Sequence, residues 1–311
     1  MANNLRRLAV LTTLIGVMLL AVALIALSYV EVGIANEIEP ESLIYTAEDI
    51  SAVPQSVAED ASRLAAEMFG NNGDRYEEFV TQLLDSYVEA NDKDFIVLFN
   101  PGGWGWSFPD SSTGWRSILD GIEVELDSLG YEAVLLNFQR TSETTWGVMK
   151  EFMEAAFHYP SKTKDLACRV AFLTGHCPDL KVIVAGESNG SIVSDGAMKI
   201  LQDNPQVYCI QTGTPFWHRP VTRERTLVLN SNGVIPDSFS RGDIPTMARA
   251  SLKSLLGIAP EEKERGTIFN FVKAPGHYYS WRYPYVYSQI TEFLEENFGI
   301  NQEEAYSSGG S

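Results

Sequence analysis

The sequence predicts an α/β fold, a mostly parallel sheet with helices on both faces. Along residues 94–299, short apolar runs of strand length alternate with longer segments in which apolar residues recur at helical spacing. Strands that alternate with helices in this way form parallel sheets that are covered on both sides. About 205 residues suffice for one such core. We therefore expect one α/β domain over residues 94–299.

The elements of this domain follow one another in a regular order. The expected strands are residues 94–100, 131–138, 182–185, 207–212, 226–230 and 267–272, and the expected helices are residues 114–129, 146–157, 163–174, 191–202, 245–256 and 284–298. The last helix is the plainest, because Pro284 stands near its start and Gly299 just past its end. No long insertion suggests a large cap, and residues 141–164 and 238–265 are the best candidates for a lid.

The N-terminus carries a candidate membrane anchor. Residues 8–30 are 23 residues without a charge, long enough to cross a bilayer. Arg6 and Arg7 precede them and glutamates follow, so the positive-inside rule leaves the N-terminus in the cytoplasm and places the rest outside. Residues 33–35 form a passable cleavage site, which makes a cleaved signal peptide the rival interpretation. We expect residues 1–30 to be a single-pass signal-anchor in the cell membrane, or the protein to be secreted if the signal is cleaved.

We interpret residues 31–93 as a linker followed by a helical hairpin. Ser56 and Glu59 form an S-x-x-E capping box that opens the first helix. A break with two glycines separates this helix from a second amphipathic one. The hairpin is expected to pack on the α/β core, with dimerisation as the alternative. Residues 300–311 are expected to be a flexible tail.

Residues 181–195 are the most informative stretch of the chain. An apolar run ends at Gly186-Glu187-Ser188-Asn189-Gly190, and a helix-compatible segment follows at once. This is G-x-S-x-G between a strand and a helix, the pattern of a nucleophile elbow. A serine on so sharp a turn needs nearly side-chain-free neighbours two residues away on either side. Ser188 is therefore the candidate nucleophile.

A base that could serve Ser188 must follow it in this arrangement. The chain has four histidines, and two of them follow Ser188. His277 comes after an apolar run that breaks at Pro275-Gly276, which places its imidazole at the end of a strand. His218 leaves too little chain for an acid-bearing strand between it and the serine. His277 is the predicted base.

The acid is the least certain member of the predicted triad. Asp237 lies in the loop after the strand at residues 226–230, and Asp243 lies a little further on. Asp237 is chosen because it is closer to the end of the strand. An aspartate after a proline is also a common turn residue, so Asp243 stays an alternative.

The strand at residues 94–100 runs into a glycine-rich loop. Small residues there let a substrate carbonyl approach backbone N–H groups, as an oxyanion hole requires. The N–H of Asn189 is one predicted donor, and that of Gly103 or Trp104 is the second. The chain has no P-loop lysine after this loop, no G-x-G-x-x-G and no H-E-x-x-H. We expect no cofactor and no catalytic metal.

With these motifs in this order, the segment from Asp94 to Phe298 resembles an α/β-hydrolase of the esterase/lipase type. The glycine-rich loop is similar to the family's H-G-G-G-type oxyanion motif, and the elbow and the late Gly-His fit their places. Two positions depart from the family. Asn100-Pro101 stands where many esterases carry His-Gly, and Asp237 comes four residues after Gly233, near which the family often places its acid.

The resemblance implies a serine hydrolase that cleaves carboxylic esters of small molecules through an acyl-enzyme. Trp106, Trp115 and Tyr278 flank the predicted site and are candidate substrate contacts, although aromatic rings in such loops also serve as packing. A peptidase, thioesterase or acyltransferase of the same fold stays open. So does a non-catalytic binding or scaffold protein, for which the unusual position of the acid is the best argument.

Charge and cysteine content set bounds. The chain carries 41 acidic and 23 basic side chains, a net charge of −18, which argues against nucleic-acid binding and against docking on anionic lipid headgroups. Cys168, Cys177 and Cys209 are an odd number, and free thiols fit about as well as a Cys168–Cys177 disulfide. Nothing in the sequence fixes the oligomeric state.

Overall fold

The computed structural model describes residues 53–71, 73–105, 113–141, 144–221, 224–258, 261, 265–269 and 272–299. The candidate anchor at residues 8–30, the linker before residue 53 and the C-terminal tail lie outside this part of the chain. Within it, no helix combines the length and the hydropathy that a bilayer crossing requires.

The centre of the molecule is a five-stranded sheet in which every neighbouring pair is parallel. Its order is β2-β1-β3-β4-β5. The strands are β1 (Phe95–Asn100), β2 (Ala133–Asn137), β3 (Lys181–Glu187), β4 (Val207–Thr212) and β5 (Thr226–Leu229). The predicted α/β fold with a parallel sheet is confirmed.

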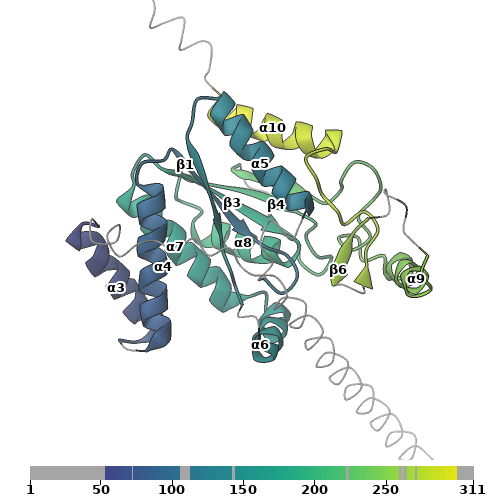
Figure 1. Ribbon diagram of the computed structural model, residues 1–311, viewed down its shortest axis with the longest axis horizontal. Helices are drawn as coiled ribbons and strands as arrows, with labels where there is room; N and C mark the ends of the chain where they lie inside the picture. The colour runs from purple at the N-terminus through teal and green to yellow at the C-terminus, as the bar shows by residue number, and fades with distance from the viewer. Residues whose placement is uncertain are drawn as a thin grey trace, which may run out of the picture.

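Helices cover both faces of this sheet (Figure 1). One face carries α5 (Thr113–Ser128) and α10 (Pro284–Phe298), and the other carries α7 (Pro160–His176) and α8 (Asn189–Ile200). Strand β1 contributes to both cores, because successive side chains of a strand point to opposite faces. Phe95, Val97 and Phe99 join the core under α5 and α10, and Ile96 and Leu98 join the other core.

The N-terminal hairpin packs on the outside of α7. Its helices are α3 (Gln55–Phe69) and α4 (Asp74–Ala90). Arg169 of α7 donates to Gln82 of α4 at 2.6 Å, and its guanidinium lies 4.6 Å from the ring centre of Phe79. The predicted capping box is wrong. The helix begins two residues earlier than a Ser56 cap requires, because its N-cap is Pro54, which makes no side-chain bond. Ser56 therefore lies inside the first turn.

The last predicted strand, residues 267–272, does not join the parallel sheet. This segment forms β6 (Thr267–Phe269) and β7 (Val272–Lys273), an antiparallel pair in a sheet of its own. The backbone N–H of Lys273 donates to Ser251 of α9 (Ile244–Leu255) at 3.0 Å. Both residues of β7 are half-buried, so the segment lacks the two covered faces that a strand of the parallel sheet has.

The three cysteines are free thiols. Cys209 lies within β4, and both Cys177 and Cys209 belong to the core on the α7 side of the sheet. The alternative of a Cys168–Cys177 disulfide is therefore not realised in this structure.

Candidate active site

Ser188 stands on the sharp turn between β3 and α8. Its backbone angles, φ 49° and ψ −117°, lie where side-chain-bearing residues rarely occur, and such strain costs on the order of 1–3 kcal/mol. A Cβ on Gly186 would lie 2.9 Å from the Cα of Ser191, and one on Gly190 would lie 2.0 Å from the carbonyl oxygen of Asn100. Both positions therefore require glycine, as the elbow motif predicts.

His277 contacts both other residues of the predicted triad. Its Nε2 lies 3.1 Å from Oγ of Ser188, and its Nδ1 lies 2.8 Å from Oδ2 of Asp237. The three residues follow three different strands, β3, β5 and β7, so only the folded chain brings them together. His218 lies apart from them and pairs with Asp195 at 3.1 Å.

Asp237 is completely buried and has five hydrogen-bond partners. The backbone N–H groups of Phe239 and Ser240 and the hydroxyl of Ser240 donate to it, beside His277 and Tyr279. Burial raises the pKa of Asp237. The charge and hydrogen bond of His277, together with the bonds from Ser240 and Tyr279, lower this pKa by more than burial raises it. Because the net pKa lies below its usual value, the carboxylate is ionised at neutral pH.

Tyr279 is a member of this cluster that the sequence did not identify. Its hydroxyl donates to Oδ2 of Asp237 at 2.8 Å. Burial and the adjacent Asp237 carboxylate raise the pKa of Tyr279 well above its ordinary value, so the hydroxyl stays protonated. Its spacing of two residues from His277 was the available signal, but any of several nearby tyrosines offered a similar one.

Asp243, the alternative acid, has a different role in the fold. It is the N-cap of α9, where its side chain accepts from the N–H of Thr246 at 3.1 Å and from the hydroxyl of Thr246 at 2.7 Å. Such a cap satisfies backbone donors that the first turn of a helix leaves unpaired. The geometry thus favours Asp237 over Asp243 as the partner of His277.

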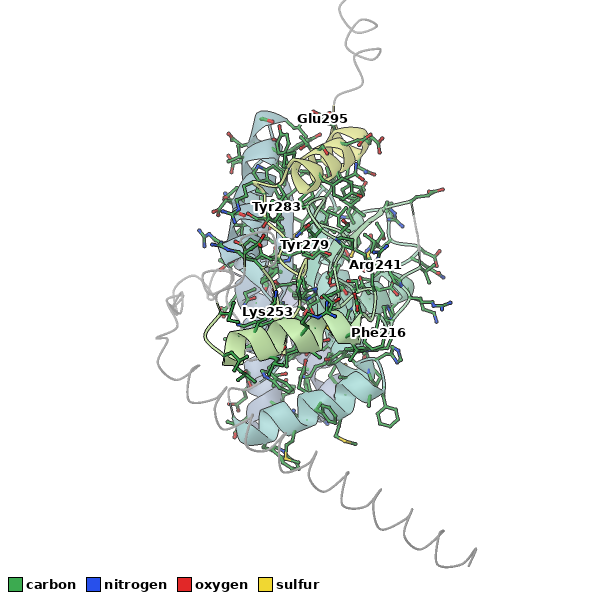
Figure 2. The ribbon with its side chains drawn as sticks, turned by 90° about the vertical axis from the view of Figure 1, so that its right-hand side faces the viewer. Phe216, Arg241, Lys253, Tyr279, Tyr283 and Glu295 are labelled. Carbon is green, nitrogen blue, oxygen red and sulfur yellow. The ribbon has the colours of Figure 1, made fainter. Side chains whose placement is uncertain are left out.

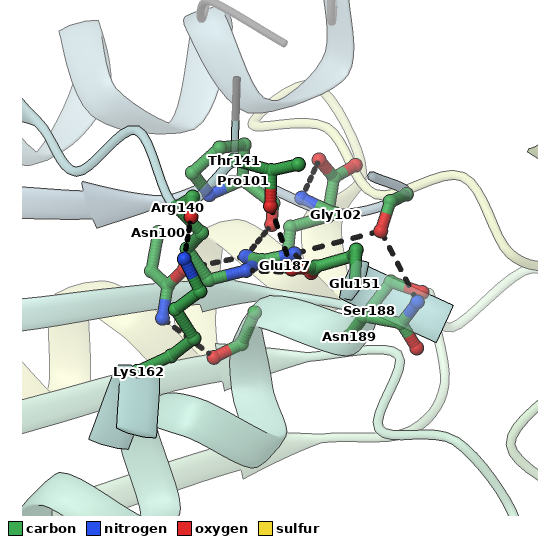
Figure 3. Close-up of polar contacts among 12 residues, drawn as sticks. Asn100, Pro101, Gly102, Arg140, Thr141, Glu151, Lys162, Glu187, Ser188 and Asn189 are labelled. Atoms are coloured by element: carbon green, nitrogen blue, oxygen red, sulfur yellow. Dashed lines mark hydrogen bonds and ion pairs between the residues drawn. The ribbon is translucent and has the colours of Figure 1, made fainter. Parts of the chain in front are cut away.

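The glycine-rich loop after β1 lies against the elbow (Figure 3). A Cβ on Gly102 would lie 3.2 Å from the Cβ of Ser188. The N–H of Gly102 donates to the side chain of Glu187 at 3.3 Å, and the side-chain amide of Asn189 donates to the carbonyl of Gly103 at 3.1 Å. These bonds tie the loop to both residues that flank the nucleophile.

The predicted oxyanion donors lie at this contact. Asn189 is the first residue of α8, so its backbone N–H has no acceptor within the helix. The turn after β1 is closed by a bond from the N–H of Gly105 to the carbonyl of Gly102 at 3.0 Å, which uses the N–H of neither Gly103 nor Trp104. Their part in binding an oxyanion stays a prediction.

Arg140 holds the glycine-rich loop through several hydrogen bonds, and no sequence motif predicted this role. Its side chain is fully buried, and Nη1 donates to the side chain of Asn100 at 2.5 Å and to the carbonyl of Pro101. Its Nε donates to Glu151 of α6 (Thr145–Ala156) at 3.1 Å. Gly105 has a φ of 81°, and a Cβ there would lie 2.7 Å from the guanidinium carbon, so a larger residue would strain the backbone and displace Arg140.

The asparagine that departs from the family pattern is part of the same support. Asn100 accepts from Arg140 and donates through Nδ2 to the carbonyl of Gly190 at 3.0 Å. It thereby links the glycine-rich loop to the first turn of α8. An amide side chain has both an acceptor and a donor, so Asn100 can accept from the guanidinium of Arg140 and donate to the carbonyl of Gly190 at the same time.

The three predicted substrate contacts have different outcomes in the structure. Trp115 is only 1% exposed, packs on Phe99 with ring centres 5.0 Å apart, and donates to Thr212 at 3.0 Å. Its predicted contact with substrate is therefore wrong, because α5 turns this ring into the core. The ring of Tyr278 packs beside Tyr283 and near two arginines, and its contact with substrate stays a prediction. Trp106 lies outside the described residues.

Comparisons with known proteins add little to this geometry. No protein-family model matches the chain, and no curated protein matches it by sequence. Among solved structures, it is similar to a Trichoderma reesei cutinase in complex with a phosphonate inhibitor. The two are 16% identical, and the alignment covers 66% of this chain and 82% of the cutinase chain with a TM-score of 0.35.

The fold and the site agree with each other. A parallel sheet lies between two helical layers, and a strained serine follows its central strand β3. A histidine is hydrogen-bonded to that serine, and a buried aspartate is hydrogen-bonded to the histidine. This arrangement fits an α/β-hydrolase, the class that the sequence predicted.

Proposed function

We propose that this protein is a serine hydrolase that cleaves carboxylic esters. The observation that carries the proposal is the unbroken path from Ser188 through His277 to the buried carboxylate of Asp237, with bonds of 3.1 and 2.8 Å. Nucleophile and base within hydrogen-bond reach, with the base oriented by a third group, are the requirements of an activated serine.

The chemistry proceeds through an acyl-enzyme. His277 takes the proton of Ser188 as Oγ attacks the ester carbonyl, and the backbone N–H of Asn189, with that of Gly103 or Trp104, binds the oxyanion. His277 then passes the proton to the departing alcohol. In the second half, His277 takes a proton from water as the water oxygen attacks the acyl carbonyl. His277 then returns this proton to Oγ of Ser188 as the acyl–Oγ bond breaks, so the acid product leaves and the serine is restored.

The scaffold alternative loses its best argument in this geometry. It depended on the late position of Asp237, and the structure joins that residue to His277 at 2.8 Å. The ester preference itself rests on the family resemblance, so it needs a test against other acyl compounds.

We expect the purified full-length chain to hydrolyse p-nitrophenyl butyrate at least about 10³-fold faster, in kcat/KM, than the matching butyryl p-nitroanilide. An anilide is a poorer acyl donor than a phenyl ester, and no feature of the described site is suited to protonating an amide nitrogen better than an alkoxide. Initial rates on the two compounds check this. An anilide rate equal to or above the ester rate would make the protein a peptidase instead.

Arg140→Lys should reduce kcat for p-nitrophenyl butyrate about 10²-fold while KM changes little. Lysine keeps a charge opposite Glu151 but lacks the planar fork that holds Asn100 and Pro101. Arg169→Lys, a change in the hairpin interface, is the matched control and should leave both constants unchanged. Equal losses in the two variants, or a change confined to KM, would contradict the positioning of the glycine-rich loop by Arg140.

We also propose that residues 8–30 anchor the enzyme with its catalytic domain on the outer side of the cell membrane. The support is the uncharged stretch of 23 residues with Arg6 and Arg7 before it. Protease added to intact spheroplasts should degrade the domain and leave a small protected fragment. A domain that is degraded only after lysis would contradict this orientation, and a soluble form beginning near Asn36 would indicate signal cleavage.

A further inference from the structure

Two helices near the active site turn apolar side chains to solvent. On α9, Ile244, Leu252 and Leu255 are 53%, 58% and 77% exposed. Their spacing of eight and three residues places them on one face of the helix, whereas Met247 faces inward. A helix on the surface of a soluble domain normally has the reverse arrangement.

Helix α6 repeats the pattern. Trp146 is 74% exposed and Met153 is 58% exposed, and they are seven residues apart on one face of the helix. Phe157, just past the end of the helix, is 70% exposed. The opposite face carries Glu151, which is buried against Arg140. The buried ion pair of Glu151 shows that α6 is packed on the domain. Its apolar side chains are therefore exposed on a packed helix and not on a detached one.

A loop joins the two helices into one surface. In residues 215–221, Phe216 and Trp217 are 45% and 43% exposed. The ring centre of His218 lies 5.6 Å from that of His158, two residues past the end of α6. Phe216 packs against the backbone before α9, where a Cβ on Gly242 would lie 3.1 Å from its ring. Figure 2 shows Phe216 and Lys253 at α9 on the same side of the molecule. We call α6, residues 215–221 and α9 the apolar rim.

The apolar rim is linked to His277 through the ring of Phe239. The ring of Trp217 lies 5.3 Å from that of Phe239, and Phe239 lies 4.9 Å from the imidazole of His277. Two ring contacts thus separate an exposed tryptophan from the base that activates Ser188. Whatever covers Trp217 therefore lies within two ring contacts of His277.

The local charge of the apolar rim differs from that of the whole chain. Together, α6, residues 215–221 and α9 carry four lysines and arginines against two aspartates and glutamates, in a chain of net charge −18. On α9, Arg249 and Lys253 are also exposed. An apolar face with basic residues beside it is the pattern of helices that lie in the interface of an anionic bilayer. The whole-chain charge, which argued against such docking, does not describe this surface.

We propose that the apolar rim docks on the surface of an anionic phospholipid bilayer, so that the ester substrate reaches Ser188 from within the membrane. This rests on the proposed ester hydrolysis. A bilayer is the expected partner of this surface because residues 8–30 of the same chain are suited to insertion in a bilayer. The 24 residues from 31 to 54 could extend by at most about 80 Å, so they can place the apolar rim on the membrane that holds the anchor.

The first test measures contact with lipid and does not depend on activity. The full-length chain, with Cys168→Ser to remove the half-buried thiol, is reconstituted into vesicles of phosphatidylcholine and phosphatidylglycerol. A bimane label is attached at Leu255→Cys or, as a control, at Val124→Cys. Val124 is also apolar and 66% exposed, but it lies on α5. Lipids with a nitroxide on the acyl chain should quench the label at position 255 at least about three-fold more than the label at position 124.

The second test uses the same vesicles with a fluorogenic ester embedded in the bilayer. The double change Leu252→Ser and Leu255→Ser should lower hydrolysis of the embedded ester at least about ten-fold and leave hydrolysis of soluble p-nitrophenyl butyrate unchanged. Val124→Ser should affect neither.

Each of the other outcomes contradicts one part of the proposal. Equal quenching at both labels excludes bilayer docking. A label at position 255 that is shielded from water but not quenched by lipid means that protein covers the apolar rim, either residues 8–30 or a second copy, which sedimentation distinguishes. Quenching without hydrolysis of any ester would leave docking in place and refute the proposed function.

Discussion

Ser188→Ala should lower hydrolysis of p-nitrophenyl butyrate by on the order of 10⁵-fold or more, because no other group can form the acyl-enzyme. The fold should survive, since the side chain of Ser188 makes only the bond to His277 among those described. Alanine also keeps the Cβ that the turn already accommodates. The measurement is kcat/KM at the pH of maximal activity, together with a thermal unfolding curve for each protein.

Ser86→Ala serves as the control for that change. Ser86 lies on α4, remote from the elbow, and its hydroxyl donates to the carbonyl of Gln82 at 2.8 Å. Its rate should stay within about two-fold of the parent. Substantial activity in folded Ser188→Ala would mean that another nucleophile, or a water molecule activated by His277, performs the reaction.

Asp237→Asn should lower the same rate by on the order of 10³ to 10⁴-fold. The five partners of the Asp237 carboxylate are all donors when His277 carries a proton on Nδ1. An amide group at this position has an NH₂ of its own, which would face at least one of those donors. The imidazole would then favour the tautomer that cannot accept the proton of Ser188.

The matched variant is Asp243→Asn. Asparagine is also a good helix N-cap, so this change should alter the rate less than two-fold and the stability of α9 only slightly. If Asp243→Asn is the more damaging of the two, the geometry around His277 does not represent the active state. If neither change matters, His277 works without an acid.

The local motifs of the fold were predictable because their signals are local. The G-x-S-x-G glycines are dictated by contacts within a few residues of Ser188 and by one approach to Asn100. The helices follow from apolar periodicity, and α10 begins at Pro284 as predicted. The prediction of a parallel strand at residues 267–272 was wrong, because a short apolar run has the same sequence pattern in a parallel strand and in a small hairpin.

The support of the site was harder to predict, since it depends on contacts between distant parts of the chain. Asp237 was chosen by its place after a strand, but its five hydrogen-bond partners come from residues 239–240, 277 and 279. Arg140 carries no motif, and its partners Asn100 and Glu151 lie 40 and 11 residues away. Trp115 was misassigned because a ring near a site in sequence can still face the core, which only the orientation of α5 decides.

The measurement that most directly tests the account is covalent labelling of the full-length chain with a fluorophosphonate, read by intact mass and peptide mapping. Such reagents react with a serine that a neighbouring base has activated. We expect one adduct per chain, located on Ser188, absent in Ser188→Ala and formed at least about 10²-fold more slowly in His277→Gln. A folded protein that forms no adduct, or an adduct on a different serine, would contradict the assignment of Ser188, His277 and Asp237 as a working triad.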